Sequence, residues 1–411
     1  MSRKNSLDVS EARQILLDAL SPITGWEALP IRGALDRILY SDIVAPFDVP
    51  AHTNSAMDGY AVRIGDLSAS GETRLSVVGT ALAGNAFSGL VGDGQAVRIM
   101  TGAVLPHGAD TVVVQECVRV DGDAVFIPPG QEAGQNVRQA GEDLARGKSA
   151  LVAGKRLGPA EIGLLASLGI GEVTVHRRLR VAFFSTGDEI ASINRPLRPG
   201  EIYDSNRYTL FGLLTRLGVN TIDLIDMGVV RDDPAALELA LREASAQADV
   251  IFTSGGVSVG DADYVRELTS RLGDVKFWKL NIKPGRPMAF GRIGNAWLFG
   301  LPGNPVAVMV TFYQVVLDAL LKLMGCDPLP DRALFKVPCV SAITKSPGRC
   351  EFPRGVLFLN DGVWKVRPAG NQGSGVLSSM SSANCFIVLP ETGPNVSAGD
   401  LVDVQPFDGL I

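Results

Sequence analysis

Residues 248–264, ADVIFTSGGVSVGDADY, carry the clearest indication of how this chain folds. The first part of this stretch, 248–254, is a mainly apolar run of strand length, and its second part is rich in glycine, serine and aspartate. A strand that runs into a glycine-rich loop and then into a helical pattern can bring backbone amides close to an anionic ligand. The loop does not end in Gly-Lys-Ser or Gly-Lys-Thr, so it lacks the signature of a nucleoside triphosphate loop.

The sequence around this stretch repeats the same alternation of strand and helix patterns. A strand pattern at 181–186 precedes a helical pattern at 205–218, and a strand at 219–225 precedes a helix that Asp233 and Pro234 would start. Asn304 and Pro305 then begin a long apolar helix. This alternation predicts a mainly parallel sheet with helices on both faces, which is a doubly wound, Rossmann-like α/β domain.

The segments on either side of this region lack the alternation of strand and helix patterns. Asp8 and Glu11 form a capping-box pattern that predicts a helix to about Leu20. From about residue 45, short apolar runs broken by glycine and proline, such as 111–115 and 124–130, predict a β-rich unit. After residue 327 helical signals disappear, and strands separated by Gly, Asp and Asn turns, as in FLNDGVWKV (358–366), predict a small C-terminal β-barrel or sandwich.

Length and composition exclude several classes of protein. A chain of 411 residues predicts roughly two to four domains. The net charge of −6 argues against nucleic acid as a partner, because binding to it needs a concentrated positive face. The N-terminus has no signal-peptide core and no later run reaches transmembrane length, so we expect a cytoplasmic protein without a membrane partner.

Cysteine and histidine give no metal or catalytic signal. The five cysteines lie far apart without a Cys-x-x-Cys pair, which predicts neither a disulfide framework nor a structural zinc site. We expect them to be buried, reduced and inert. The three histidines are equally scattered, and we assign them no catalytic role.

The loops that follow the strands of the α/β domain carry most of the chemistry. Ligands of such sheets bind beyond the carboxyl ends of the strands. Glycines, hydroxyl groups and helix N-terminal amides in these loops suit an oxyanion, and neighbouring carboxylates suit a hard cation such as Mg²⁺. The residues concerned are Asp188, Glu189, Asp226, Asp232, Asp233, Gly255, Gly256, Ser258, Asp261, Asp263, Lys279, Lys283 and Arg286.

Simpler interpretations exist for several of these residues. Asp233 and Asp261 are equally well explained as helix caps, the glycine pair as a turn, and Lys279 as an exposed strand residue. Their coincidence in successive loops on one predicted edge favours a binding site. Outside these loops, Asp58 in NSAMDGYAV, Thr101 in RIMTGAVLP and the segment GLPGNPVAV (300–308) also look chemically unusual, although each could be only a turn.

Together the motifs NSAMDGYA, RIMTGA, AGEDL, FSTGDE, IYDSNR, RDDP, TSGGVSVGDADY, KLNIKPGRP and LPGNP resemble the molybdopterin molybdenumtransferase family. These are the molybdenum insertases related to the C-terminal domain of gephyrin, and the resemblance covers about residues 8–407. It implies an elongated α+β domain in two pieces (1–44 and 144–178), an inserted β-rich domain (45–143), a molybdopterin-binding α/β domain (179–327) and a C-terminal β-barrel (328–411).

The resemblance also implies the reaction and its residues. Adenylyl-molybdopterin and molybdate would be the substrates, AMP and molybdenum cofactor the products, Mg²⁺ the cofactor and a homodimer the assembly, with possible handover to molybdoenzymes or other cofactor-biosynthesis proteins. By motif, the catalytic residues would be Asp58, Thr101, Asp143, Glu189, Asp232 and Asp263, of which Glu189, Asp232 and Asp263 would hold the metal. The substrate-binding residues would be Gly255, Gly256, Ser258, Lys279, Lys283, Arg286, Pro302, Pro305, Arg354 and Ser374.

Two alternatives remain open at this point. The related molybdopterin adenylyltransferases resemble residues 180–325 alone, and that activity would consume ATP. A non-catalytic cofactor carrier or scaffold would bind the same ligands without turnover. The additional β-rich domains favour the insertase over the adenylyltransferase.

Overall fold

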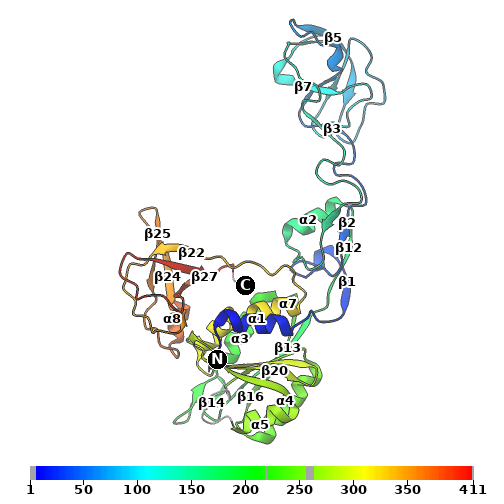
Figure 1. The fold of residues 1–411 in the computed structure, drawn as a ribbon. Coiled ribbons are helices and arrows are strands. Elements are labelled where there is room, and N and C mark those ends of the chain that lie inside the picture. The colour runs from blue at the N-terminus through cyan, green and yellow to red at the C-terminus, as the bar shows by residue number, and fades with distance from the viewer. Residues whose placement is uncertain (1–5, 219, 256–262, 410–411) are drawn as a thin grey trace, which may run out of the picture. The chain divides into compact units, whose positions relative to one another are not determined.

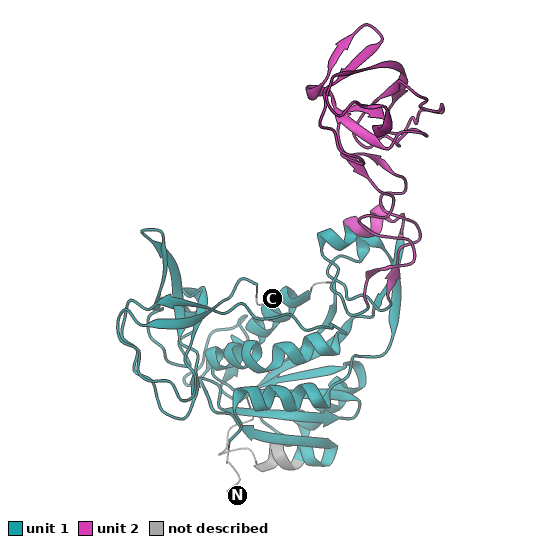
Figure 2. Ribbon diagram, turned by 45° about the horizontal axis from the view of Figure 1, so that its top comes forward, with its two compact units in different colours: residues 1–41, 153–162, 172–411 teal, residues 42–152, 163–171 magenta. Residues whose placement is uncertain are grey.

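The structure, drawn in Figure 1, is a computed structural model that describes residues 6–218, 220–255 and 263–409, with the side chains of 263–267 also outside the description. The chain divides into two compact units, coloured in Figure 2. Unit 1 comprises residues 1–41, 153–162 and 172–411, and unit 2 comprises residues 42–152 and 163–171. The four domain boundaries expected from the sequence are finer than this division and stay a prediction.

Unit 1 contains the mainly parallel sheet that the alternation predicts (Figure 1). Over the described residues its strand order is β16 (Ile222–Val230), β13 (Leu179–Thr186), β17 (Val250–Ser254), β21 (Ala296–Leu301), β20 (Pro287–Ile293) and β18 (Gly273–Lys279). The first four strands pair in parallel, and the remaining pairs are antiparallel. The carboxyl ends of the parallel strands therefore meet at one edge, where ligands of such sheets bind.

Helices cover both faces of this sheet, which is why its central strands read as unbroken apolar runs. Phe183 packs in a core with residues of three helical segments, α1 (Val9–Ala19), α3 (Asn206–Gly218) and the helix from Pro305. Its neighbour Phe184 points to the opposite core, formed with α4 (Pro234–Gln247) and α5 (Asp263–Leu272). The doubly wound α/β architecture is confirmed.

The two predicted helix starts have different outcomes. Asp233 caps α4, since its carboxylate accepts a hydrogen bond from the amide of Ala236 at 2.9 Å. Asp8 precedes α1 as predicted but makes no side-chain capping bond. Its carboxylate accepts from Asn281 Nδ2 at 2.7 Å instead, so a long-range contact has replaced the local cap.

The strand expected at 219–225 lies further along the chain than the sequence pattern indicated. The structure places β16 at Ile222–Val230, and its register with β13 shifts between Phe183 and Ser185. Gly228 in this irregular part has a φ of +81°, a conformation that suits glycine in a bulge. The bulge and the alternating aspartates concealed the second half of the strand.

One long helix runs through the core of unit 1 from Pro305 to Leu323. It consists of α6 (Pro305–Thr311), a π-helical turn (Phe312–Val316) and α7 (Leu317–Leu323). Its length and composition would allow it to cross a membrane, which corrects the expectation that no run is long enough. However, 89% of the apolar window is buried inside the protein, as in the core helix of a folded domain.

Unit 2 contains the β-rich part predicted after residue 45. Its larger sheet has the strand order β7 (Thr111–Val114), β4 (Gly59–Val62), β6 (Gln95–Ile99), β5 (Thr73–Ala81), β9 (Ala124–Ile127) and β8 (Arg119–Asp121) over the described residues. Two apolar clusters include residues of this sheet, one around Val113 and one around Val112. The β structure expected at 111–115 and 124–130 is confirmed, with the strands ending at Val114 and at Ile127.

The C-terminal part of unit 1 forms the predicted β-barrel. Its sheet has the order β22 (Phe335–Pro338), β27 (Leu401–Pro406), β26 (Cys385–Val388), β24 (Arg354–Asn360) and β25 (Val363–Pro368) in the described chain. A bridge between Cys339 and Val366 brings the two ends of this sheet together. Asp361 and Gly362 both have positive φ in the tight hairpin between β24 and β25, as the NDG sequence predicts.

Candidate active site

A polar pocket of about 420 Å³ lies in unit 1 where loops of the α/β domain and the β-barrel meet. It is lined by the segment 282–287, the segment 302–304 that follows β21, Ala307 in the long helix, Arg349, and the barrel segment 372–374. We call it the cationic pocket, because its lining includes Lys283, Arg286 and Arg349 and, among the residues that the structure describes, no carboxylate. Such a lining suits an oxyanion.

Sequence reasoning found part of this cationic set. Lys283 and Arg286 were predicted, and Pro302 and Ser374 also line the pocket. Arg349 was missed, although it stands only five residues before the predicted Arg354. It reaches the pocket from the barrel, so only the tertiary structure places it beside a loop more than sixty residues earlier in the chain.

The loop 302–305 joins the pocket to the start of the long helix. Pro305 occupies the first helical turn, and the amide of Val306 donates to the carbonyl oxygen of Ser374 at 3.1 Å. Asn304 does not cap the helix with its side chain but donates from Nδ2 to Ser374 Oγ at 3.0 Å. The barrel loop is thus fastened to the N-terminal end of a helix whose dipole favours an anion.

The loop 283–286 rests directly on the same helix. Gly285 has a φ of +111°, and a Cβ there would lie 2.5 Å from Thr311 Oγ1. Glycine is therefore required by both the backbone conformation and the close approach. This contact holds Lys283 and Arg286 near the helix start.

A buried hydrogen-bond network connects the glycine-rich loop with the loop 302–305. Asn206 at the start of α3 donates from Nδ2 to Ser254 Oγ at 2.8 Å and to the carbonyl oxygen of Gly303 at 2.6 Å. Ser254 Oγ in turn donates to the carbonyl oxygen of Pro302 at 3.3 Å. Asn206 belongs to the motif IYDSNR, but no role was predicted for it. A buried amide that joins two loops is a tertiary role that sequence spacing does not disclose.

Gly255 starts the glycine-rich loop in a conformation that only glycine readily adopts. Its φ is +95°, and a Cβ would overlap the carbonyl oxygen of Thr186. The loop therefore leaves β17 in close contact with the end of β13. Two predicted binding residues, Gly256 and Ser258, lie outside the described residues.

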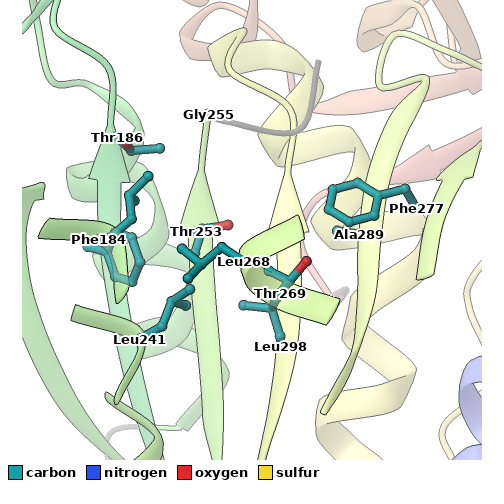
Figure 3. Close-up of a pocket in the computed structure, with 11 residues that line it drawn as sticks. Phe184, Thr186, Leu241, Thr253, Gly255, Leu268, Thr269, Phe277, Ala289 and Leu298 are labelled. Carbon is teal, nitrogen blue, oxygen red and sulfur yellow. The ribbon is translucent and has the colours of Figure 1, made fainter. Parts of the chain in front are cut away.

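A small apolar cavity lies below Gly255 and is a feature of core packing (Figure 3). Its lining includes Phe184, Leu241 and Leu298, and its volume is about 30 Å³. That volume is close to the space of a single water molecule. The cavity is therefore too small for a pterin or a nucleotide.

The acidic loops at the carboxyl edge come together in part. The amide of Asp232 donates to Asp188 Oδ1 at 3.4 Å, which brings the loops after β13 and β16 into contact. Glu189 is exposed in the first of these loops, and Asp263 begins α5 with its side chain outside the description. Among the described residues, no three histidine, cysteine, aspartate or glutamate side chains form a group that could hold a metal ion.

In unit 2 the structure brings Asp58 and Thr101 together as a pair. Asp58 Oδ1 accepts hydrogen bonds from the amide and the hydroxyl of Thr101, both at 2.7 Å. These two bonds, with the backbone bond the larger cause, lower the pKa of the Asp58 carboxyl. Asp143, the third residue predicted in this part of the chain, is exposed in the same unit.

Arg354 has a different position from the one predicted. It is buried in the barrel, where Nε donates to Ser379 Oγ and Nη2 donates to the carbonyl oxygens of Asn371 and Gly373. Burial lowers its pKa to about 10. Arg354 therefore supports the loop that lines the cationic pocket and is not itself among the lining residues. This buried position does not fit the direct anion contact expected of Arg354.

Lys279 is also not among the residues that line the pocket. It ends β18 with an exposed side chain, as the simpler interpretation of an exposed strand residue describes. Its backbone carbonyl accepts a hydrogen bond from the amide of Leu7.

The expectation that all five cysteines are buried and inert is confirmed only in part. All five are free, and Cys339 and Cys385 are buried as expected, but Cys117 is exposed. Burial raises the pKa of the thiols of Cys350 to about 11 and of Cys385 to about 12, so these thiols stay protonated at neutral pH.

A second polar cavity, of about 440 Å³, contains Arg13 and Arg332 beside the long helix. Arg13 donates to the carbonyl oxygen of Gln314, and Arg332 donates to that of Tyr313. Both arginines also pair with Asp318. The π-helical turn leaves carbonyl groups available for such bonds, so the arginines of this cavity stabilise the helix and are less suited than the cationic pocket to bind a ligand.

Comparison with known proteins gives consistent matches along the chain. Three family models match, described as "MoeA N-terminal region (domain I and II)" over residues 7–169, "Probable molybdopterin binding domain" over residues 182–322 and "MoeA C-terminal region (domain IV)" over residues 336–407. A molybdopterin molybdenumtransferase of Haemophilus influenzae is 43% identical over 407 residues, covering 98% of this chain and 100% of that protein. One from a Nostoc species is 38% identical, covering 91% and 87%.

A solved structure agrees with these sequence relatives. The crystal structure of a molybdopterin biosynthesis MoeA protein from Pyrococcus horikoshii superimposes with a TM-score of 0.83 at 30% identity. The match covers 98% of this chain and 100% of the other.

Proposed function

We propose a mechanism from the premise that this chain belongs to the molybdopterin molybdenumtransferase family and is a transferase that inserts molybdenum into molybdopterin. We infer that molybdate binds in the cationic pocket. The observation that carries this inference is the lining, in which Lys283, Arg286 and Arg349 are the charged side chains that the described part of the chain contributes. Molybdate is a dianion at neutral pH, and preorganised cations are the groups that hold such a charge.

We further propose that the second substrate, adenylyl-molybdopterin, binds across the carboxyl edge of the sheet. The Gly255 loop would hold its phosphate, because the backbone there approaches closely and follows a parallel strand directly. Asn206 connects this loop with the segment 302–303 of the cationic pocket. The two substrates would therefore bind on loops whose relative position is fixed by the buried side chain of Asn206.

In this mechanism the protein acts mainly by electrostatic positioning. Insertion of molybdenum would be coupled to cleavage of the phosphate anhydride, with AMP as the leaving group. The sulfur ligands of the metal would come from the dithiolene of the substrate, which agrees with the raised pKa of Cys350 and Cys385 in this chain. No histidine is needed as a general acid or base.

Mg²⁺ is part of the proposal through the acidic loops. Glu189 and Asp232 supply the hard oxygen ligands that Mg²⁺ prefers, and the contact between Asp188 and Asp232 brings two of these loops together. The described residues do not complete a coordination set, and the side chain of Asp263 would be the third ligand. When bound, the ion would neutralise charge on the phosphates.

We propose a homodimer as the working assembly, in which both copies line the cleft. Asp58, Thr101 and Asp143 of unit 2 would then act on a site that includes the cationic pocket. A complementation experiment tests this arrangement: two inactive variants, Asp58→Ala and Lys283→Met, should regain activity when mixed after subunit exchange. No recovery with mixed dimers demonstrated would reject a shared site. Cytoplasmic location and handover to molybdoenzymes stay predictions.

The decisive experiment for the reaction measures what is released from adenylyl-molybdopterin. With Mg²⁺ and molybdate present, we expect AMP and molybdenum cofactor in equal amounts, and little AMP when molybdate is omitted. An adenylyltransferase would consume ATP and accumulate the adenylylated pterin, while a carrier would bind it without turnover. AMP release that does not depend on molybdate would reject the proposed function.

A further inference from the structure

Lys283 of the cationic pocket forms an ion pair with the buried carboxylate of Glu351, which does not line the pocket. Glu351 Oε2 accepts a hydrogen bond from Lys283 Nζ at 3.2 Å. The side chain of Glu351 is only 5% exposed, whereas that of Lys283 is 45% exposed. The carboxylate therefore stands behind the ammonium group and leaves the outer side of that group accessible.

The backbone fixes this pair in place. β19 (Ile282–Lys283) pairs in parallel with β23 (Cys350–Glu351), with Lys283 directly opposite Glu351. The amide of Phe352 also donates to the carbonyl oxygen of Lys283 at 3.0 Å. Because both main chains are held, the two side chains start from neighbouring positions of one strand pair, and the ammonium reaches the carboxylate without any change in the backbone.

A turn that precedes β23 supplies a second acceptor, which competes with a ligand for the ammonium group of Lys283. Ser346 Oγ accepts from Lys283 Nζ at 3.1 Å, and the amide of Ser346 donates to Glu351 Oε1 at 2.6 Å. An ammonium group has three donors, so these two bonds leave one for a ligand.

A buried lysine holds this turn rigid. Lys345 is 6% exposed, and its Nζ donates to the carbonyl oxygens of Ser346, Arg349 and Glu391 at 2.8–3.2 Å. The turn that carries Ser346 is therefore fixed to the turn that carries Arg349 into the pocket. Glu351 and Ser346 cannot simply move away when an anion arrives.

We propose that Glu351 is a positioning residue that orients Lys283 and lowers the affinity of the cationic pocket for its oxyanion. The anion and the carboxylate compete for one ammonium group, so molybdate is held weakly enough to be passed on. This inference rests on the proposed function of the pocket and adds a residue that does not touch the substrate. Removal of the charge of Glu351 should therefore strengthen binding, whereas loss of a merely structural residue would weaken it.

The test is equilibrium binding of molybdate alone to the full-length protein, measured by calorimetry. Glu351→Gln keeps an oxygen that can accept from Ser346 and removes the charge, and we expect it to bind molybdate about two- to fivefold tighter, the range of a partly exposed ion pair. The molybdate concentration at half-maximal AMP release should fall by the same factor. Asp403→Asn is the matched control, because it changes the net charge equally at the exposed Lys336 pair of the same barrel and should leave binding unchanged.

Ser346→Ala keeps the amide bond to Glu351 and removes only the second competitor, so it should also tighten binding, by less than Glu351→Gln. If Glu351→Gln does not fold, this variant decides the question. Wild-type binding together with equal or weaker binding by the folded variants would overturn the inference. Failure of the wild-type protein to bind molybdate would instead reject the proposed role of the pocket, and the inference with it.

Discussion

Gly255→Ala is the perturbation that most directly joins the fold to the proposed site. Its φ of +95° is a conformation that costs a residue with a Cβ about 1–2 kcal/mol. The added methyl group would also overlap the carbonyl oxygen of Thr186 at the end of β13. Relief of such an overlap in a packed region costs about 1–3 kcal/mol more. Because the loop can shift in part, we expect unit 1 to lose about 2–3 kcal/mol of unfolding free energy.

The rate of AMP release by Gly255→Ala should fall by more than the loss of unfolding free energy alone would cause. A shift of the Gly255 backbone away from Thr186 would also displace the adjacent Ser254, whose hydroxyl accepts a hydrogen bond from Asn206. Displacement of a substrate-positioning group by about 1 Å can cost a factor of about 100, so we expect molybdate-dependent AMP release to fall about 10- to 100-fold.

Urea unfolding and AMP release measure the two effects separately. Gly212→Ala is the control, because a Cβ on this exposed face of α3 would meet no atom within 4 Å. That variant should be as stable as the wild-type protein or slightly more stable, since alanine favours a helix over glycine. A Gly255→Ala protein with the wild-type unfolding midpoint and rate would refute the reasoning from backbone geometry.

Three further predictions concern charged residues. Asp249→Asn should lower the unfolding free energy of unit 1 by about 2–3 kcal/mol at pH 7, because a part-buried carboxylate loses its pairs with Arg177 and Arg180. Burial alone would raise the pKa of Asp249, but hydrogen bonds from these arginines outweigh burial and lower the pKa. The wild-type protein should therefore lose this stabilisation as the pH falls below about 5, whereas the stability of the variant should not show that loss. A wild-type unfolding free energy that stays constant between pH 6 and 3 would contradict this. Asp58→Ala should reduce AMP release at least about tenfold, because it removes an ionised carboxylate, and unchanged release would reject a catalytic role. Arg354→Lys should raise the half-saturating molybdate concentration and lower the unfolding midpoint, because lysine cannot reach all three acceptors of the buried guanidinium; a variant with both values unchanged would show that Arg354 does not support the pocket loop.

Local patterns were sufficient for the elements whose neighbours in sequence are also their neighbours in space. The Asp233-Pro234 start of α4 and the Asp361-Gly362 hairpin depend on hydrogen bonds within a few residues, and both were predicted. Where a distant group competes, the local rule failed. Asp8 bonds to Asn281 and leaves its helix uncapped, and β16 continues through a bulge that the sequence pattern treats as a strand end.

The candidate site also contains residues that motifs predicted correctly and one residue whose position depends on distant packing. Lys283, Arg286, Pro302 and Ser374 were predicted from motifs, and the structure brings them into one pocket. Arg354 carries the same kind of charge, but its burial in the barrel makes it a support for the pocket loop. A sequence pattern gives the charge of an arginine, whereas the solvent exposure of that charge depends on the packing around it.

The sequence by itself determined the α/β alternation, the glycine-rich loop after β17 and the family to which the chain belongs, because these depend on the order of residue types along the chain. Only the tertiary structure decided that Arg349 enters the pocket and that Glu351 stands behind Lys283. The strand pair β19–β23 joins residues sixty-eight positions apart. The strength of a charge depends on its distance from other charges in space, and no spacing along the chain contains that distance.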